Sequence, residues 1–210
     1  MDPSLSSSNM NFKFLRQLAE RYEIVLGSSS PRRLRLLTEI DIPFVQKIPS
    51  VDEERLPGES PFEYALRLAR DKATLIGRRS SDHQVVLGCD TVVALGDQTL
   101  EKPVDTDDAF RILSTLSGHQ HVVCTAVAVY AAGVVKASDY ELTEVFFNDV
   151  TSDQIRDYIA TGEPMDKAGA YGIQGMGAFL VDTIRGNLDN VVGLPRQLLE
   201  RLAYETLRNL

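Results

Sequence analysis

The sequence predicts a protein of the α/β or α+β class, built on a mixed β-sheet. Segments with a strand-like pattern alternate with segments that carry apolar residues at helical spacing over most of the chain. Residues 121–150 interrupt this alternation with two or three consecutive strands and a turn at Gly133, which favours antiparallel pairing. Hydrophobic residues make up 43% and charged residues 25% of the 210 residues, as is typical of globular proteins.

The first half of the chain gives its elements in the following order. Residues 1–11 are polar and are expected to fray, and residues 13–22 have the apolar spacing of a short helix. A strand over residues 23–26 leads to Ser30 and Pro31, which suit the N-cap and first position of a second helix. A third helix over residues 60–76 opens with a capping box between Ser60 and Glu63, and an apolar strand follows over residues 84–95.

The second half begins with a predicted helix over residues 105–118 that ends at Gly118. After the antiparallel block, a capping box between Thr151 and Gln154 opens a helix that runs to Gly162. Residues 178–187 read as a strand and turn, and residues 194–207 as a closing helix. We expect an N-terminal extension over residues 1–21, partly disordered with a short helix, and one domain over residues 22–210.

Charge and composition exclude several classes of function. A net charge of −8 argues against a general affinity for nucleic acid. No apolar run is long enough to cross a bilayer, and the first residues lack the pattern of a secretory signal. Cys89 and Cys124 lie in apolar strand-like runs, so we expect buried thiols in a reducing compartment, the cytoplasm. Without a C-x-x-C motif and with three histidines, a structural zinc site is not expected.

The segment VLGSSSPRR, residues 25–33, ends an apolar strand in hydroxyl groups and fixed positive charge. The free N–H groups and the dipole at a helix N-terminus attract anions, but the same dipole disfavours Arg32 and Arg33 in the first turn. A bound polyanion would explain both arginines. The alternative, which these residues support equally, is an exposed capped helix whose arginines pair with surface acids.

The segment GCDTVVALGDQTLEKP, residues 88–103, places Asp90 inside an apolar strand and Lys102 after a turn. A buried charge is costly unless it is paired or bound to a metal. An acid and a lysine that a hairpin brings together suit metal-assisted phosphate chemistry. Taken alone, these residues favour the simpler interpretation, a strand-edge aspartate paired with a lysine.

Three further segments carry weaker or broader signals. In VDEER, residues 51–55, Glu53 could join Asp90 at one metal, although such acidic runs more often form solvated loops. Lys72 lies in an amphipathic helix, where lysines usually face solvent. Residues 161–180 combine five glycines with charged, amide and apolar side chains, which favours an ordered loop that contacts a ligand over a flexible linker.

Together these segments resemble the Maf family of nucleoside triphosphate pyrophosphatases. The matching pieces cover about residues 22–200 in the order of the family: SSSPRR, RLARDKA, GCDTVV, EKPVD, LSGHQHVVCTAVAV, TGEPMDKAGAYGIQG and NVVGLP. The resemblance implies an elongated mixed sheet with flanking helices in two lobes around a cleft, similar to inosine triphosphate pyrophosphatases. It also implies hydrolysis between the α and β phosphates with Mg²⁺, Mn²⁺ or a similar divalent cation, and it allows a homodimer.

The resemblance assigns roles to individual residues. Asp90 matches the catalytic carboxylate that accepts a proton from the attacking water, and it would share the metal with Glu53. Lys72 and Lys102 match catalytic lysines that face the triphosphate. Substrate-binding positions are matched by Ser28 and Arg33 at the phosphates and by Arg32, Thr91 and Gln174 at positions linked to substrate choice.

The segment DKAGAYGIQG resembles the branch of the family that prefers dTTP and UTP. The Gln174 carboxamide offers a donor and an acceptor, which complements N3–H and the carbonyl oxygens of uracil and thymine. Guanine presents adjacent N–H donors, which a carboxylate would accept better. We therefore predict a dTTP/UTP pyrophosphatase that also takes modified pyrimidine nucleotides. The alternatives are a 7-methyl-GTP pyrophosphatase and a low-turnover nucleotide-binding regulator of cell division, although binding alone would not require Asp90 as a base.

Overall fold

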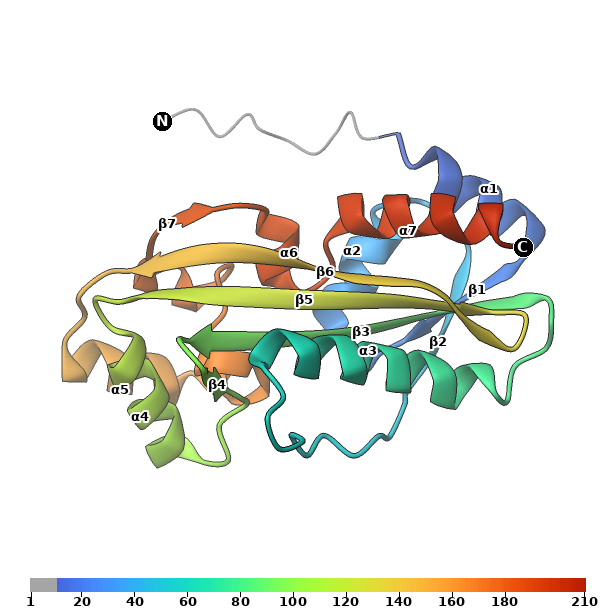
Figure 1. Ribbon diagram of the computed structural model, residues 1–210. Helices are drawn as coiled ribbons and strands as arrows, with labels where there is room; N and C mark the ends of the chain where they lie inside the picture. Colours follow the sequence, from blue (N-terminus) through green and yellow to red (C-terminus); the bar gives the residue numbers. More distant parts are fainter. Residues whose placement is uncertain (1–10) are drawn as a thin grey trace.

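The structure is a computed structural model that describes residues 11–210, and it contains one mixed sheet (Figure 1). The seven strands follow the order β2-β1-β3-β5-β6-β7, with β4 paired to β3. Their bounds are β1 (Glu23–Gly27), β2 (Phe44–Lys47), β3 (Gln84–Leu95), β4 (Gln98–Leu100), β5 (Gln120–Ala131), β6 (Val134–Phe147) and β7 (Val181–Arg185). β1 is parallel to β2 and β3, whereas the other pairs are antiparallel, so the predicted mixed sheet is confirmed.

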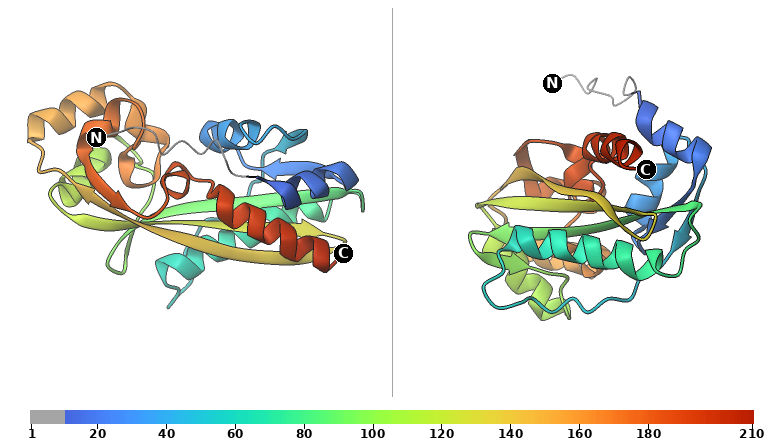
Figure 2. Two further views of the ribbon diagram at one scale, coloured as in Figure 1. Left: turned by 90° about the horizontal axis from the view of Figure 1, so that it is seen from above. Right: turned by 45° about the vertical axis from the view of Figure 1, so that its right-hand side comes forward.

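Helices cover both faces of the sheet (Figure 2). The α-helices are α1 (Lys13–Arg21), α2 (Pro31–Thr38), α3 (Pro61–Gly77), α4 (Thr106–Leu116), α5 (Ser152–Ala160), α6 (Leu188–Val192) and α7 (Arg196–Arg208). Three 3₁₀ turns follow α5: η1 (Glu163–Asp166), η2 (Ala168–Ala170) and η3 (Met176–Leu180). α3 lies on one face, and α1, α2 and α7 lie on the other. Among residues 11–210, no helix is both long and apolar enough to cross a membrane.

Local sequence signals fix most helix starts as predicted. The Ser30 hydroxyl accepts a hydrogen bond from the Arg33 N–H, and both predicted capping boxes are present. The block over residues 121–150 resolves into two strands, because the chain turns between β5 and β6 at Gly133, where φ is +83°. β2, α6 and the 3₁₀ turns were not predicted, because segments this short carry little periodicity.

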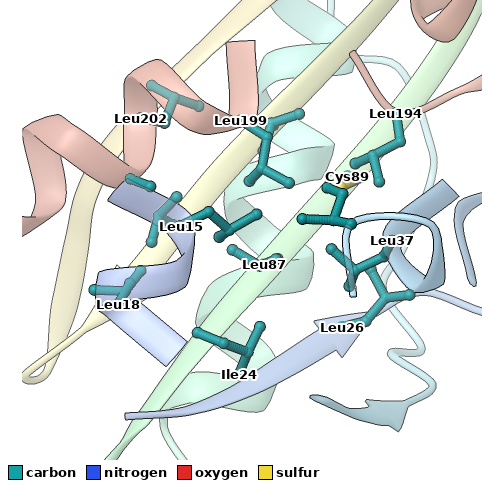
Figure 3. Close-up of a cluster of buried hydrophobic side chains, with 14 of the residues drawn as sticks. Leu15, Leu18, Ile24, Leu26, Leu37, Leu87, Cys89, Leu194, Leu199 and Leu202 are labelled. Atoms are coloured by element: carbon teal, nitrogen blue, oxygen red, sulfur yellow. The ribbon is translucent and has the colours of Figure 1, made fainter. Parts of the chain in front are cut away.

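Alternation along β3 divides its side chains between two cores. Leu87 and Cys89 face the core beneath α1, α2 and α7 (Figure 3). Val86 and Val92 face the core beneath α3. Cys89 and Cys124 are buried and free, as expected for thiols in apolar strands. Because residues of even number face α3, Asp90 is carried toward that helix.

α1 is packed into the core and receives its N-terminal cap from α7. No side chain of its own caps this helix. Instead, the Glu200 carboxylate accepts hydrogen bonds from the backbone N–H groups of Phe14, at 2.7 Å, and Leu15, at 2.9 Å. Leu15 and Leu18 are fully buried. The domain boundary at residue 22 stays a prediction. The fraying expected over residues 1–11 falls almost wholly outside the described residues, which begin at residue 11.

Candidate active site

A cavity of about 380 Å³ opens where one edge of β3 lacks a neighbouring strand. Pairing of β1 with β3 ends at Gly27 and Gly88, and pairing with β4 begins at Val93. Between these points, residues 89–92 have no partner on that edge within the described chain, while β5 pairs with the other edge. Ligands commonly bind beyond the carboxyl end of a parallel strand such as β1.

The structure brings the residues predicted from sequence together around this cavity. Its lining includes Ser28, Arg32, Arg33, Glu53, Lys72, Asp90, Thr91, Lys102 and Gln174. These residues come from five separate parts of the chain: the β1–α2 connection and α2, the loop before α3, α3, β3 with the segment after β4, and the glycine-rich segment. Their shared location is a structural finding, whereas their individual roles stay predictions.

Asp90 and Lys72 form an ion pair because α3 packs directly on β3. At Gly88, a Cβ atom would lie 2.2 Å from the Ala69 carbonyl oxygen, so glycine is required at this contact. The Lys72 Nζ lies 2.6 Å from an Asp90 carboxylate oxygen and 2.6 Å from a Glu53 carboxylate oxygen. Asp90 and Lys72 are only 8% and 9% exposed.

One sequence interpretation is therefore wrong, because Lys72 does not lie on a solvated helix face. Asp90 is paired with a lysine, as the simpler interpretation expected, and it lies where one edge of β3 has no neighbouring strand within the described chain. The β3–β4 hairpin does bring Lys102 to the cavity, but the lysine that pairs with Asp90 is Lys72. Sequence spacing could not distinguish the two lysines, because the choice depends on how closely α3 approaches β3.

The two carboxyl groups that pair with Lys72 ionise differently. Burial raises the pKa of Asp90 above its usual range, although the charges of Lys72 and Arg33 oppose this shift. Partial burial also raises the pKa of Glu53, but the hydrogen bond and charge of Lys72, together with Lys102 and Arg33, outweigh it and lower the pKa overall. Asp90 is thus the more basic carboxylate, which suits a proton acceptor.

The oxygen donors at the cavity suit a hard divalent cation. Mg²⁺ is usually bound by one or two carboxylates together with phosphate oxygens and water. Glu53 and Asp90 converge on a single point, now filled by the Lys72 ammonium group. Within residues 11–210, no three His, Cys, Asp or Glu side chains are arranged to hold a metal on their own. Glu53 and Asp90 would hold such a cation together with phosphate oxygens of a ligand and water.

Arg33 is held from three sides at the cavity wall. Its Nε donates to the Gly193 carbonyl at 2.8 Å, and its terminal nitrogens donate to Ser28 Oγ at 3.0 Å and Thr91 Oγ1 at 2.9 Å. Arg32 instead pairs with Asp166 at 3.0 Å. The expectation that these arginines pair with surface acids thus holds for Arg32 but not for Arg33.

A buried polar network behind Thr91 was not predicted. The Thr125 hydroxyl donates to the Asn190 carbonyl at 2.8 Å, so the Thr91 hydroxyl, 2.9 Å away, must donate to Thr125. The Asn190 carboxamide is fully buried and accepts from the Thr125 N–H at 3.0 Å. An asparagine next to the apolar run VVGL was the available signal. The network fixes the hydroxyl that receives the Arg33 hydrogen bond.

The loop that carries Glu53 is tied to α3 by two residues that sequence reasoning also missed. The Tyr64 hydroxyl contacts the Glu53 carbonyl oxygen and lies 3.1 Å from a Glu101 carboxylate oxygen. Arg67 donates to the Glu54 carbonyl at 2.9 Å. Much of the segment is exposed, as expected for a solvated loop, but its backbone is anchored at Glu53.

The glycine-rich segment folds around the Glu163 carboxylate. This group accepts hydrogen bonds from the Tyr158 hydroxyl at 2.9 Å and from the N–H groups of Met176 and Gly177 at 3.0 and 3.1 Å. At Gly175, φ is +92° and a Cβ atom would lie 2.9 Å from Glu163 Oε2. The segment is thus an ordered wall of the cavity, with internal hydrogen bonds that a flexible linker would lack.

Gln174 lies on this wall, and Arg35 of α2 donates a hydrogen bond to its carboxamide oxygen. The sequence predicts that both ends of the Gln174 carboxamide are available to a base. In the structure the oxygen already accepts a hydrogen bond from Arg35, whereas the amino group has no hydrogen-bond partner within residues 11–210.

The chain is similar in sequence to known proteins over most of its length. The Maf-like protein family matches residues 23–206. A dTTP/UTP pyrophosphatase of Pseudoalteromonas atlantica is 45% identical over 86% of this chain and 97% of its own length. One of Yersinia pestis is 49% identical over 82% of this chain and 87% of its own.

A HAM1 protein from Coxiella burnetii has a solved structure with a TM-score of 0.46 and 16% identity, covering 88% of this chain and 99% of that one. This structural likeness is too distant to assign a function. The family match spans most of the sequence and includes every residue predicted to line the site. The chain belongs to the Maf-like protein family.

Proposed function

We propose that this chain hydrolyses dTTP and UTP to the nucleoside monophosphate and pyrophosphate. The observation that carries the proposal is a buried carboxylate, Asp90, in a cavity whose wall also bears Arg33, Lys72 and Lys102. The similarity to proteins named dTTP/UTP pyrophosphatases supports the choice of reaction and substrate.

The cationic groups would bind the triphosphate, which carries about four negative charges near neutral pH. Arg33 is already oriented by its three hydrogen bonds, so it needs little reorganisation to meet an anion. Lys102 makes no hydrogen bond or ion pair to other described residues in the range 11–210, so its ammonium group is available to a phosphate oxygen. The N–H groups at the start of α2 add partial positive charge beside Ser28.

Asp90 would accept the proton of the attacking water, because burial raises its pKa and the rigid strand β3 fixes its position. The Lys72 ammonium group pairs with the Asp90 carboxylate. It would shift toward the negatively charged phosphates when the nucleotide binds. A divalent cation such as Mg²⁺ or Mn²⁺, held by Glu53 and Asp90, would supply charge neutralisation at the phosphates. The modified pyrimidine nucleotides predicted from sequence remain part of the proposal.

Two wider expectations accompany the proposal. The two buried free cysteines suit a reducing compartment, which supports a cytoplasmic location. A homodimer stays a prediction, and light scattering of the purified chain would measure it.

The test is pyrophosphate release from a panel of dTTP, UTP, CTP, GTP and 7-methyl-GTP, with Mg²⁺ and with EDTA. We expect dTTP and UTP to react fastest, to yield the monophosphate and pyrophosphate, and to stop reacting with EDTA. Release of orthophosphate with a diphosphate product would contradict cleavage between the α and β phosphates. A preference for 7-methyl-GTP would move the chain to that branch. Tight binding without turnover would identify a regulator.

A further inference from the structure

The orientation of the Gln174 side chain is set by its neighbour. Arg35 Nη2 donates to Gln174 Oε1. A guanidinium group has five N–H donors and no acceptor, so only the oxygen of a carboxamide can face it. The amino group therefore points away from Arg35, and within residues 11–210 no acceptor contacts it. Because Gln174 lines the cavity, its amino group is the end of the carboxamide that a ligand can meet without competing with Arg35.

Arg35 is itself positioned by α2 and its contacts. Its Nε lies 3.8 Å from a Glu39 carboxylate oxygen one turn later. The other Glu39 oxygen accepts from Arg196 at 3.0 Å, and Arg196 is buried and paired with Asp189 at 2.6 Å. This chain of charges lies on the Nε side of the Arg35 guanidinium and leaves Nη2 for Gln174.

We propose that Arg35 is a positioning residue that selects uracil and thymine over cytosine by fixing which end of Gln174 faces the base. The proposal rests on the proposed function, because it concerns the base-reading step of that site. Uracil and thymine carry a carbonyl acceptor at C4, where cytosine carries an amino donor. A fixed amide donor can pair with the carbonyl oxygen but meets the cytosine amino group donor to donor.

The experiment compares kcat/KM for UTP and CTP in variants of the full-length chain. Arg35→Met keeps a long side chain but removes every donor, so the Gln174 carboxamide can turn. The UTP-to-CTP ratio should then fall by roughly three- to tenfold, the usual effect of one net hydrogen bond. Arg35→Glu supplies only acceptors, which should draw the amino group toward residue 35, present the oxygen to the base and lower the ratio further. Arg35→Lys keeps a charged donor and should preserve most of the ratio.

The UTP-to-CTP ratio of kcat/KM distinguishes a role of Arg35 in positioning Gln174 from two simpler effects of the substitutions. Loss of a positive charge weakens binding of every triphosphate equally, so it leaves the ratio unchanged. Loss of fold lowers the melting temperature and all activities together. Arg201→Met is the matched control, because Arg201 is 49% exposed against 54% for Arg35 and pairs with Asp139 and Glu205 away from the cavity. It should leave both the ratio and the activity unchanged.

A double-mutant test places the effect in Gln174. In a Gln174→Ala background, Arg35→Met should no longer change the UTP-to-CTP ratio. The proposal is overturned if Arg35→Met and Arg35→Glu are folded and keep the wild-type ratio, or if the ratio changes equally without Gln174. A wild-type chain that hydrolyses no pyrimidine triphosphate would overturn the proposed function as well, so the two failures are distinguishable.

Discussion

Asp90 is the residue on which the proposed chemistry most depends. Asp90→Asn keeps the shape of the side chain but removes the negative charge and the base. We expect kcat for dTTP to fall at least about a hundredfold, the usual size of a general-base contribution. Pyrophosphate release at saturating Mg²⁺ and nucleotide measures the loss, and circular dichroism checks that the variant is folded.

The matched control is Asp139→Asn, at a half-buried aspartate on β6 that pairs with Arg201. It removes the same charge at a distance from the cavity, and its turnover should remain that of the wild type. Near-normal turnover of Asp90→Asn would remove Asp90 from the mechanism.

Gln174 gives a second prediction at this scale. Gln174→Glu keeps the length of the side chain but replaces the amide donor with an acceptor, which can still pair with Arg35. The kcat/KM for dTTP and UTP should fall by roughly ten- to a hundredfold, because a base carbonyl then faces a carboxylate. Guanine nucleotides should lose less or gain. Assays with dTTP, UTP, GTP and 7-methyl-GTP measure this, and an equal loss on all four would mean that Gln174 only supports its loop.

The sequence reveals residues whose chemistry conflicts with their local setting. Asp90 in an apolar strand and Arg33 in the first turn of a helix are two such conflicts, and both residues line the cavity. Arg35 has no such conflict. Its partner Gln174 lies 139 residues away in the sequence, so only the folded chain shows the contact. The same holds for Asn190, which lies 65 residues from Thr125.

At the scale of elements, the packing of α3 on β3 is the contact that assembles the Asp90–Lys72 pair. In Gly88→Ala, the new methyl group would lie 2.2 Å from the Ala69 carbonyl and 2.6 Å from the Ala73 nitrogen. The helix must then move away from the strand. We expect a loss of about 1–3 kcal/mol in the free energy of unfolding, together with a fall in kcat. Urea denaturation and dTTP hydrolysis measure the two effects.

Gly96→Ala is the control for the loss of a glycine as such. A Cβ atom at Gly96 would meet nothing within 4 Å, although φ is +60°. This variant should cost about 1 kcal/mol from backbone strain alone and leave kcat unchanged. Equal effects of the two substitutions on kcat would show that close packing at Gly88 does not position the ion pair.

Elements with local signals were predictable, and those set by distant partners were not. The capping boxes at Ser60 and Thr151 act within four residues, and both helices begin where the sequence indicates. β2 has four residues with little alternation in burial, and its strand conformation depends on pairing with β1. The cavity depends on where β1 stops and β4 starts along β3, and that register has no local signature.

At the scale of the whole molecule, buried His121 makes stability depend on pH. The side chain is 2% exposed, its Nε2 lies 2.9 Å from the Tyr171 hydroxyl, and the Phe147 ring packs against it. Burial lowers the pKa of His121 to about 4, from an ordinary value of 6.5. The unfolded chain therefore takes up a proton at a higher pH than the folded chain does. The neutral, buried His121 therefore contributes to the free energy of unfolding in full above pH 6.5. This contribution declines as the pH falls toward 4 and amounts to about 3 kcal/mol at most.

Urea denaturation between pH 7.5 and 4 measures this contribution. His121→Phe should flatten the part of the pH dependence that the histidine causes, whereas His83→Gln, at an exposed position, should not. Acidic residues also titrate near pH 4. The free energies of unfolding of the two variants are therefore subtracted at each pH, which isolates the effect of His121. Identical pH profiles would show that His121 takes up protons equally in the folded and unfolded states.

The cap that Glu200 places on α1 affects when the chain can finish folding during synthesis. α1 has nine residues, and isolated helices of that length are unstable in water. Two of its first N–H groups find their acceptor only in α7, more than 180 residues later. As the chain emerges from a ribosome, the apolar side chains of α1 must therefore remain without their final partners until α7 has been made. The first described helix is synthesised early but becomes stable among the last, which leaves it open to chaperones and proteases during nearly the whole of translation.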